Sequence, residues 1–108
     1  METQVEVKTP INLASQVPVK AGDFERTLLV ANAHGLVQLL TFAAGSGLTP
    51  HTANAPVVVT VVSGRVNFVI DGKEHEMKAG DAIVIPADTE HSVSAIEDTR
   101  IVLSKLGL

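Results

Sequence analysis

The sequence contains no cysteine, no tryptophan and no tyrosine, and it has only three phenylalanines. Without cysteine, disulfide bonds, thiolate metal ligands and cysteine nucleophiles are all excluded. The most apolar run, Val57 to Val62, has six residues, far fewer than the ~20 that a membrane-spanning helix needs. The first residues lack a basic segment followed by an apolar one, so they do not resemble a secretory signal peptide. We therefore expect a cytoplasmic protein with no membrane partner.

Positive charge is also scarce. Eight lysines and arginines stand against twelve aspartates and glutamates, which gives a net charge of −4 at pH 7. Because there is no basic stripe and no aromatic platform, we expect no nucleic-acid partner. The sequence also lacks a phosphate-cradling glycine loop, a nucleophile elbow and a CxxC pair, so NTPase, hydrolase and thiol-redox chemistry lack their residues.

Aliphatic residues dominate what is present. Hydrophobic residues make up 45% of the chain, largely valine, leucine and alanine, and valine favours strands. They recur with a period of two between turn residues, which predicts one all-β sandwich or barrel domain over residues 1–108. The expected strands are Thr3–Lys8, Phe24–Ala31, Leu36–Ala43, Val57–Val62, Val66–Ile70, Lys73–Met77, Ala82–Ile85, His91–Ile96 and Arg100–Leu106.

Three segments have a different pattern. Pro18 interrupts Ile11–Val19, so residues from about 1 to 20 are expected to form an extended arm or an edge strand. Gly45–Gly47 is expected to be a loop, because glycine adopts backbone angles that other residues avoid. Thr99–Leu108 is compatible with a strand or with a short helix.

The most informative region spans residues 45–95. It holds two blocks of glycine and histidine, each next to a β-rich run, and this arrangement suggests a barrel whose loops and strands direct histidines to one interior point. The residues of this pattern are Gly45, His51, Gly64, Gly80, Pro86 and His91.

This pattern resembles the two motifs of the small cupins, RmlC-like proteins whose fold is a double-stranded β-helix, or jelly-roll barrel. The first motif has a second histidine where this chain has Ala53 and a glutamate where it has Val57. The second motif has a glycine where this chain has Asp88 and an asparagine where it has Ala95. The resemblance implies the jelly-roll fold. It implies no single activity, because this fold hosts oxygenases, isomerases and sugar binders.

Metal-dependent cupins are implied to hold iron, manganese, nickel or zinc with three histidines and a glutamate. Of that set only His51 and His91 are present, so no cofactor is firmly implied. The two histidines could line a ligand pocket, form a reduced metal shell, or serve structure alone. No catalytic residue is assigned, and a tyrosine-dependent sugar epimerase lacks its tyrosine.

Strand alternation predicts the walls of a pocket around the two histidines. Such a pocket would be mostly apolar with a small polar pole, as small-molecule sites commonly are. The alternative is that the same valines pack the core and leave little space. His34 is expected at a hairpin tip on the surface, and His75 is expected away from His51. The expected pocket residues are His51, His91, Val57, Val59, Val61, Phe68, Val93 and Ala95.

These observations support three hypotheses. The first is a small cupin that binds a small organic ligand without a firmly held metal. The second is a metal-dependent oxygenase or isomerase with a two-histidine shell. The third is a sensory or interaction module without catalysis. A homodimer is also expected, because the apolar fraction is large and the N-terminal arm could add to a neighbour's sheet edge.

Overall fold

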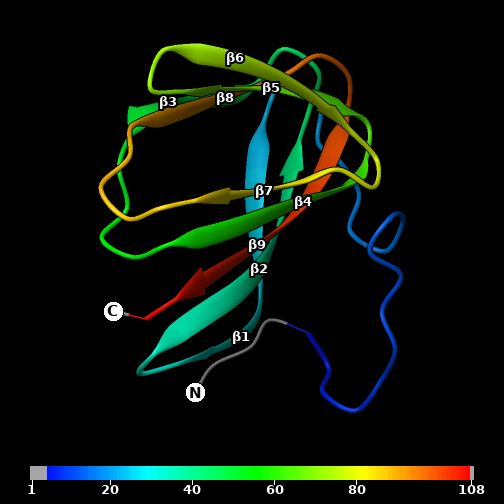
Figure 1. Ribbon diagram of the computed structural model, residues 1–108. Helices are drawn as coiled ribbons and strands as arrows, with labels where there is room; N and C mark the ends of the chain where they lie inside the picture. Colours follow the sequence, from blue (N-terminus) through cyan, green and yellow to red (C-terminus); the bar gives the residue numbers. More distant parts are fainter. Residues whose placement is uncertain (1–4, 108) are drawn as a thin grey trace.

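Two antiparallel β-sheets face each other in the computed structural model, which describes residues 5–107 (Figure 1). One sheet has the strand order β1-β2-β9-β4-β7 and the other has the order β3-β8-β5-β6. No helix occurs within residues 5–107, so the expected all-β fold is confirmed. The strands are β1 (Phe24–Asn32), β2 (Gly35–Phe42), β3 (Gly47–His51), β4 (Val57–Ser63), β5 (Arg65–Ile70), β6 (Lys73–Lys78), β7 (Ala82–Ile85), β8 (His91–Ala95) and β9 (Thr99–Leu106).

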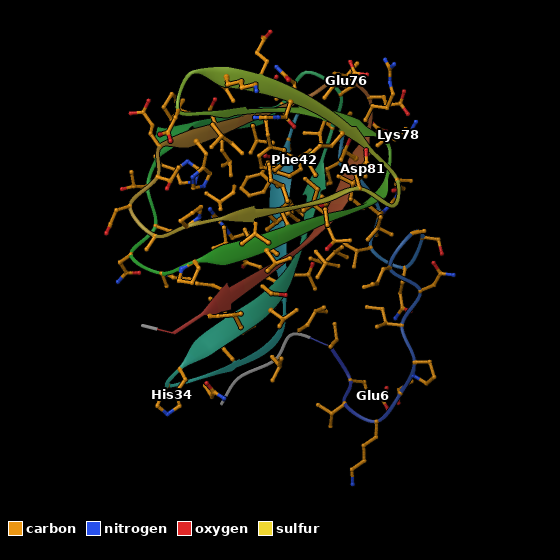
Figure 2. All side chains as sticks on the ribbon, in the orientation of Figure 1. Glu6, His34, Phe42, Glu76, Lys78 and Asp81 are labelled. Carbon is orange, nitrogen blue, oxygen red and sulfur yellow. The ribbon has the colours of Figure 1, made fainter. Side chains whose placement is uncertain are left out.

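The inner faces of the two sheets enclose an aliphatic core. Along β4, Val57, Val59 and Val61 are buried while the residues between them are half-buried, as expected for a strand with one face inward. Phe42 points into the space between the sheets (Figure 2) and stacks on Phe24 with the ring centroids 4.6 Å apart. Strand alternation therefore decides which side chains reach the interior.

Eight of the nine strands lie within one residue of the expected ranges. The final segment is the strand β9, which pairs with β2 on one side and β4 on the other, and is not a helix. The strand β3 was not expected, because Gly45–Gly47 and Pro50 are typical of a loop. The strand begins at Gly47. Glycine is needed at this position because a Cβ there would collide with the backbone carbonyl of Val93 on β8.

The N-terminal arm forms no strand within residues 5–23, so the strand expected at Thr3–Lys8 is wrong for residues 5–8. Residues 3 and 4 of that segment lie outside the described residues. Lys8 has a positive φ of 65°, which is incompatible with an extended strand. Farther along, the Arg100 side chain donates to the Val17 carbonyl, so the arm lies against β9. Leu39 is fully buried although it does not belong to the core cluster between the sheets, and it lies two residues from Thr41, the cross-strand partner of Arg100.

The β1–β2 hairpin carries one end of its sheet beyond the opposing sheet (Figure 1). His34 lies exposed at its tip (Figure 2), where the backbone N–H of His34 donates to Oδ1 of Asn32, so its expected surface position is confirmed. The described chain, residues 5–107, includes no helix with the length and apolar character needed to cross a membrane.

Candidate functional site

His51 and His91 meet at the end of the four-stranded sheet. They are direct cross-strand partners on the neighbouring strands β3 and β8. Their imidazole rings lie edge to face, with the centroids 4.3 Å apart and an interplanar angle of 60°. His91 is buried, whereas His51 is exposed. The structure thus brings together the two histidines that the sequence singled out.

An irregularity in β3 places His51 opposite His91. Leu48 pairs with Val93, but the register shifts before the next pair, so two residues on β3 oppose a single residue on β8. Pro50 is one of those two residues, and bulges on edge strands are where a strand tolerates proline. The bulge re-aims the following side chain, which brings the His51 imidazole next to that of His91.

Both imidazoles are held by the same local contact. Nδ1 of His51 lies 2.8 Å from the Thr49 carbonyl oxygen, and Nδ1 of His91 lies 2.9 Å from the Thr89 carbonyl oxygen. A carbonyl oxygen only accepts, so Nδ1 carries the proton in each ring. In the neutral imidazole, Nε2 is then left as a hydrogen-bond acceptor or as a metal ligand.

A small enclosed cavity lies beside the two rings. Its volume is about 20 Å³, which is room for about one water molecule. The two histidines are its polar residues, and the remainder of the wall is aliphatic or aromatic. The lining residues are Leu40, Phe42, Leu48, His51, Val59, Phe68, His91, Val93, Ile101 and Leu103.

An open hollow adjoins this cavity at the mouth between the two sheets. Its volume is about 190 Å³, and it is lined by Arg26, Leu48, Thr49 and His51. Leu48 and His51 line both spaces, so the enclosed cavity and the open hollow meet at these two side chains. We call the hollow of these four residues the mouth hollow.

Of the eight pocket residues expected from the sequence, five line the enclosed cavity: His51, His91, Val59, Phe68 and Val93. Val57, Val61 and Ala95 are buried but pack in the core away from the cavity wall. The enclosed space is too small for an organic molecule, so of these two spaces only the mouth hollow has room for one. His75, on β6, lines neither space.

Sequence reasoning did not identify Arg26 and Leu48. Arg26 could have been found, because it lies two residues after Phe24 in the expected strand Phe24–Ala31. The two side chains therefore share a face of that strand, and phenylalanine marks this face as the inward one. Leu48 lies in a segment whose glycines and proline concealed a strand.

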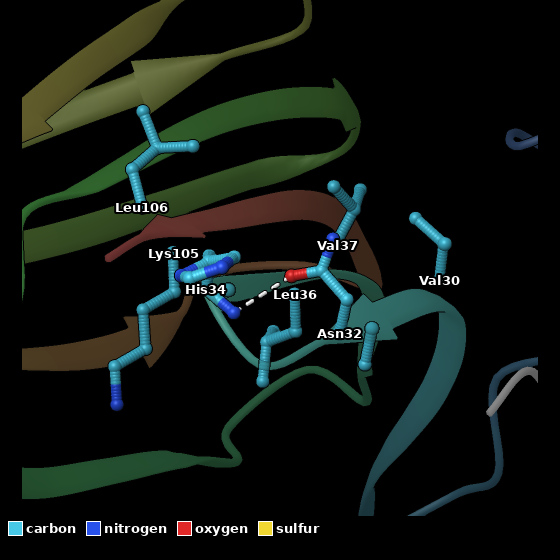
Figure 3. A pocket seen from close by; sticks show the side chains of 9 residues that line it. Val30, Asn32, His34, Leu36, Val37, Lys105 and Leu106 are labelled. Atoms are coloured by element: carbon cyan, nitrogen blue, oxygen red, sulfur yellow. Dashed lines mark hydrogen bonds between the residues drawn. The ribbon is translucent and has the colours of Figure 1, made fainter. Parts of the chain in front are cut away.

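A third hollow, of about 260 Å³, lies at the tip of the β1–β2 hairpin (Figure 3). Its wall combines the exposed side chains of Val30 and Leu106 with His34 and Lys105. It shares no lining residue with the enclosed cavity or the mouth hollow. Because the third hollow lies away from His51 and His91, we treat the histidine pair and the mouth hollow as the candidate site.

Residues 38–104 match the family described as the cupin domain, and this match covers more than half of the chain. The chain belongs to the cupin family. The resemblance noted from the two histidine blocks is thereby confirmed, and the sandwich described above is the jelly-roll of this family.

Solved cupin-like structures share the fold. A protein of unknown function from Streptococcus pyogenes superposes with a TM-score of 0.91 at 21% identity, covering 100% of this chain and 96% of that one. A Cupin 2 conserved barrel domain protein from Leptotrichia buccalis superposes with a TM-score of 0.84 at 31% identity, covering 89% of this chain and 47% of that one.

One curated relative is similar over part of the chain. Dimethylsulfoniopropionate lyase DddW of Ruegeria pomeroyi is 39% identical over 54 residues, which are 50% of this chain and 36% of that protein. The match thus spans little more than a third of the relative's length. It supports membership of the family and leaves the activity of this chain to be proposed.

The side chains at the site do not fit the metal that the family commonly holds. Within residues 5–107, no group of three or more His, Cys, Asp or Glu side chains is placed to hold an ion. Ala53 and Val57, which stand at the missing ligand positions, offer no donor atom, and Val57 is buried in the core. Two neutral imidazoles without a carboxylate leave a divalent charge uncompensated in an apolar site.

Proposed function

We propose that this cupin domain binds a small organic molecule in the mouth hollow, with the imidazole of His51 in the wall of the hollow and that of His91 packed directly against it. The single observation that carries the proposal is the matched anchoring of the two rings. Because each Nδ1 is held by a backbone carbonyl, the rings are fixed and both Nε2 atoms are kept for a partner.

The surroundings of the histidines support the same proposal. Leu48 and Phe68 supply apolar surface beside the rings, and small-molecule sites typically combine such surface with a few fixed polar groups. Within residues 5–107, a single buried side-chain nitrogen or oxygen atom has no hydrogen-bond partner, and that atom is Ser63 Oγ. Nε2 of His91 is not such an atom, so part of its surface stays accessible to a ligand although His91 as a whole is buried.

The second candidate is a metal-dependent oxygenase or isomerase that uses the two histidines alone. One observation favours it, since metal-ligating histidines also commonly donate their other ring nitrogen to a carbonyl or carboxylate. The missing third donor argues against it. A resident metal is therefore the alternative function and not the leading one.

Ring NMR signals of the four histidines test the leading proposal. Protein labelled with ¹³C in its histidine rings is titrated with a panel of small acids, amides, alcohols and amines. We expect one chemical class to shift the His51 and His91 signals in a saturable way. His34 and His75 lie outside the site and serve as internal controls. If no compound shifts the His51 and His91 signals selectively, the proposal fails.

Metal analysis of tag-free protein separates the two candidates. We expect less than one equivalent of iron, manganese, nickel or zinc, and no rise in melting temperature when these ions are added to metal-free protein. One equivalent of a transition metal that is lost in both His51→Ala and His91→Ala would overturn the leading proposal. His75→Ala is the matched control, because it removes an imidazole from outside the site.

A further inference from the structure

We propose that the ligand of the mouth hollow is a small hydroxy-carboxylate, whose carboxylate binds Arg26 and whose hydroxyl donates to a histidine Nε2. This inference rests on the proposed function, because it names the chemistry of the molecule bound at the same site. It follows from the position of Arg26, the charges around it and the tautomer of the two imidazoles.

Arg26 reaches the mouth because it lies on the inward face of β1. It is the cross-strand partner of Leu40, whose side chain lines the enclosed cavity. β1 is the edge strand of one sheet and β3 is the edge strand of the other, so an inward side chain of β1 emerges at the rim beside β3. Arg26 and His51 accordingly line the same hollow from opposite sheets.

The guanidinium of Arg26 is positioned by stacking. Its central carbon lies 4.9 Å from the centroid of the Phe24 ring, which in turn stacks on the buried ring of Phe42. A guanidinium stacked on an aromatic face keeps its N–H groups free in its own plane. Those groups match the two oxygens of a carboxylate in a bidentate arrangement.

Arg26 has no carboxylate partner within residues 5–107. The ion pairs among these residues join Lys20 to Glu25 and Arg65 to Glu76 and Glu97. Glu25 adjoins Arg26 in sequence but is bonded to Lys20 at 2.7 Å, an interaction that raises the Lys20 pKa.

Neither the mouth hollow nor the enclosed cavity has an acidic lining residue. The rim is thus locally positive on a chain whose net charge is −4. This field favours an anion over a cation, and it disfavours a divalent metal as well.

The histidines define the other end of the ligand. With Nδ1–H bound to a backbone carbonyl, the neutral imidazole offers only an acceptor at Nε2. A second carboxylate oxygen would be repelled there, whereas a hydroxyl group can donate to it. The hollow of about 190 Å³ is below the ~300 Å³ at which ordinary ligand pockets begin. It therefore suits a molecule of a few carbon atoms.

Matched pairs of probes test this inference by NMR titration of the labelled histidines. Lactate and 3-hydroxybutyrate are compared with their neutral amides, which keep the shape and the hydroxyl but lose the charge. We expect each acid to bind about tenfold more tightly than its amide, as expected for loss of a charge-assisted pair. Propionate, which lacks the hydroxyl, is expected to bind more weakly than lactate.

Substitutions of arginine assign the preference to one residue. In Arg26→Gln the acids are expected to bind no better than the amides, whereas Arg65→Gln keeps the full preference. Arg65 is the matched control, because it is exposed and pairs with glutamates outside the site. Arg26→Lys keeps the charge without the planar fork and is expected to be intermediate. Amide ¹H–¹⁵N spectra verify that each variant is folded.

The outcomes distinguish this inference from the proposed function. Equal affinity for acids and amides, or an undiminished preference in Arg26→Gln, would overturn the hydroxy-carboxylate while the proposed function stands. Equal binding of propionate and lactate would overturn the hydroxyl contact. If none of the acids or amides shifts the His51 and His91 signals but an amine or alcohol does, the ligand class is wrong. Failure of every probe removes both proposals.

Discussion

The backbone N–H of Asp88 donates to the carbonyl of Ala53 across 2.8 Å. This hydrogen bond ties the loop that follows His51 to the loop that precedes His91. Both residues stand where the family motifs have something else, since Ala53 takes the place of a histidine and Asp88 that of a glycine. The two departures thus meet at one contact beside the histidine pair.

Asp88 has a positive φ of 60°, which explains why the family motif has glycine at this position. Aspartate tolerates the left-handed region better than most residues, and alanine does not. We expect Asp88→Ala to lower the free energy of unfolding by about 1 kcal/mol, whereas Asp88→Gly changes it by less than about 0.5 kcal/mol. Urea denaturation measures both values. Equal losses in the two variants would show that the aspartate side chain matters and not the backbone angle.

Gly64 is required by both its backbone angle and its neighbours. Its φ is 87°, and an added Cβ would collide with the Asp98 carbonyl and lie 2.7 Å from Cα of Thr99. Thr99 cannot move aside easily, because it is fully buried and its hydroxyl bonds to the carbonyls of Arg65 and Glu97. We expect Gly64→Ala to cost at least about 3 kcal/mol of unfolding free energy.

The matched control is Gly72→Ala. Gly72 also has a positive φ, of 80°, but nothing lies within 4 Å of its added Cβ. We expect a loss of about 1 kcal/mol there, from the backbone angle alone. If the two alanine variants are equally stable in urea, the contact with Asp98 and Thr99 does not constrain Gly64.

The sequence predicts the fold well because period-two patterns and turn glycines are local signals. Val57–Val62 and the Asp71–Gly72 turn identify their strands without knowledge of the rest of the chain. The strand β3 was missed because its reason is not local: Gly47 is needed to approach the carbonyl of Val93, which lies far along the sequence. The arm was misjudged for a related reason, since alternation over residues 3–8 does not reveal a backbone turn at Lys8.

The candidate site is predictable only in part. The motif spacing identifies His51 and His91, and alternation identifies the inward valines. Cavity size is not a local property, because it depends on how the side chains of two sheets interlock. Arg26 becomes part of the site only when β1 and β3 are known to border the same opening.

The arm is expected to stabilise the barrel by covering Leu39. The arm is hydrogen-bonded to Arg100, whose cross-strand partner Thr41 lies two residues from Leu39. We expect deletion of residues 1–19 to expose this fully buried side chain and to lower the free energy of unfolding by about 2–3 kcal/mol. Leu39→Ala tests the cause. It is expected to cost about 2–5 kcal/mol in the full chain and much less in the shortened one, where Leu39 is already exposed. Equal costs in both backgrounds, measured in urea, would mean that the arm does not cover Leu39.

The tautomers of His51 and His91 are directly measurable. Because each Nδ1 faces a carbonyl oxygen, we expect a proton on Nδ1 and none on Nε2 in both rings. Long-range ¹H–¹⁵N spectra of the imidazoles in alkaline buffer distinguish the two forms. Exposed His34, whose ring has no such contact among residues 5–107, is expected to show no such fixed preference. A proton on Nε2 of either site histidine would contradict the anchoring on which the proposed function depends.

A homodimer remains a prediction, and the hairpin tip is the surface where it can be tested. Val30 and Leu106 are 40% and 60% exposed there and line the same open hollow. Burying such side chains against a second copy removes apolar surface from water. We expect light scattering at micromolar concentration to give twice the chain mass, and Leu106→Glu to give the mass of one chain. Val7→Glu tests the other interface, because Val7 is 62% exposed on the N-terminal arm, which was expected to add to a neighbour's sheet edge. A single-chain mass for the unaltered protein, or a dimer that survives Leu106→Glu but not Val7→Glu, would contradict an interface at the hairpin.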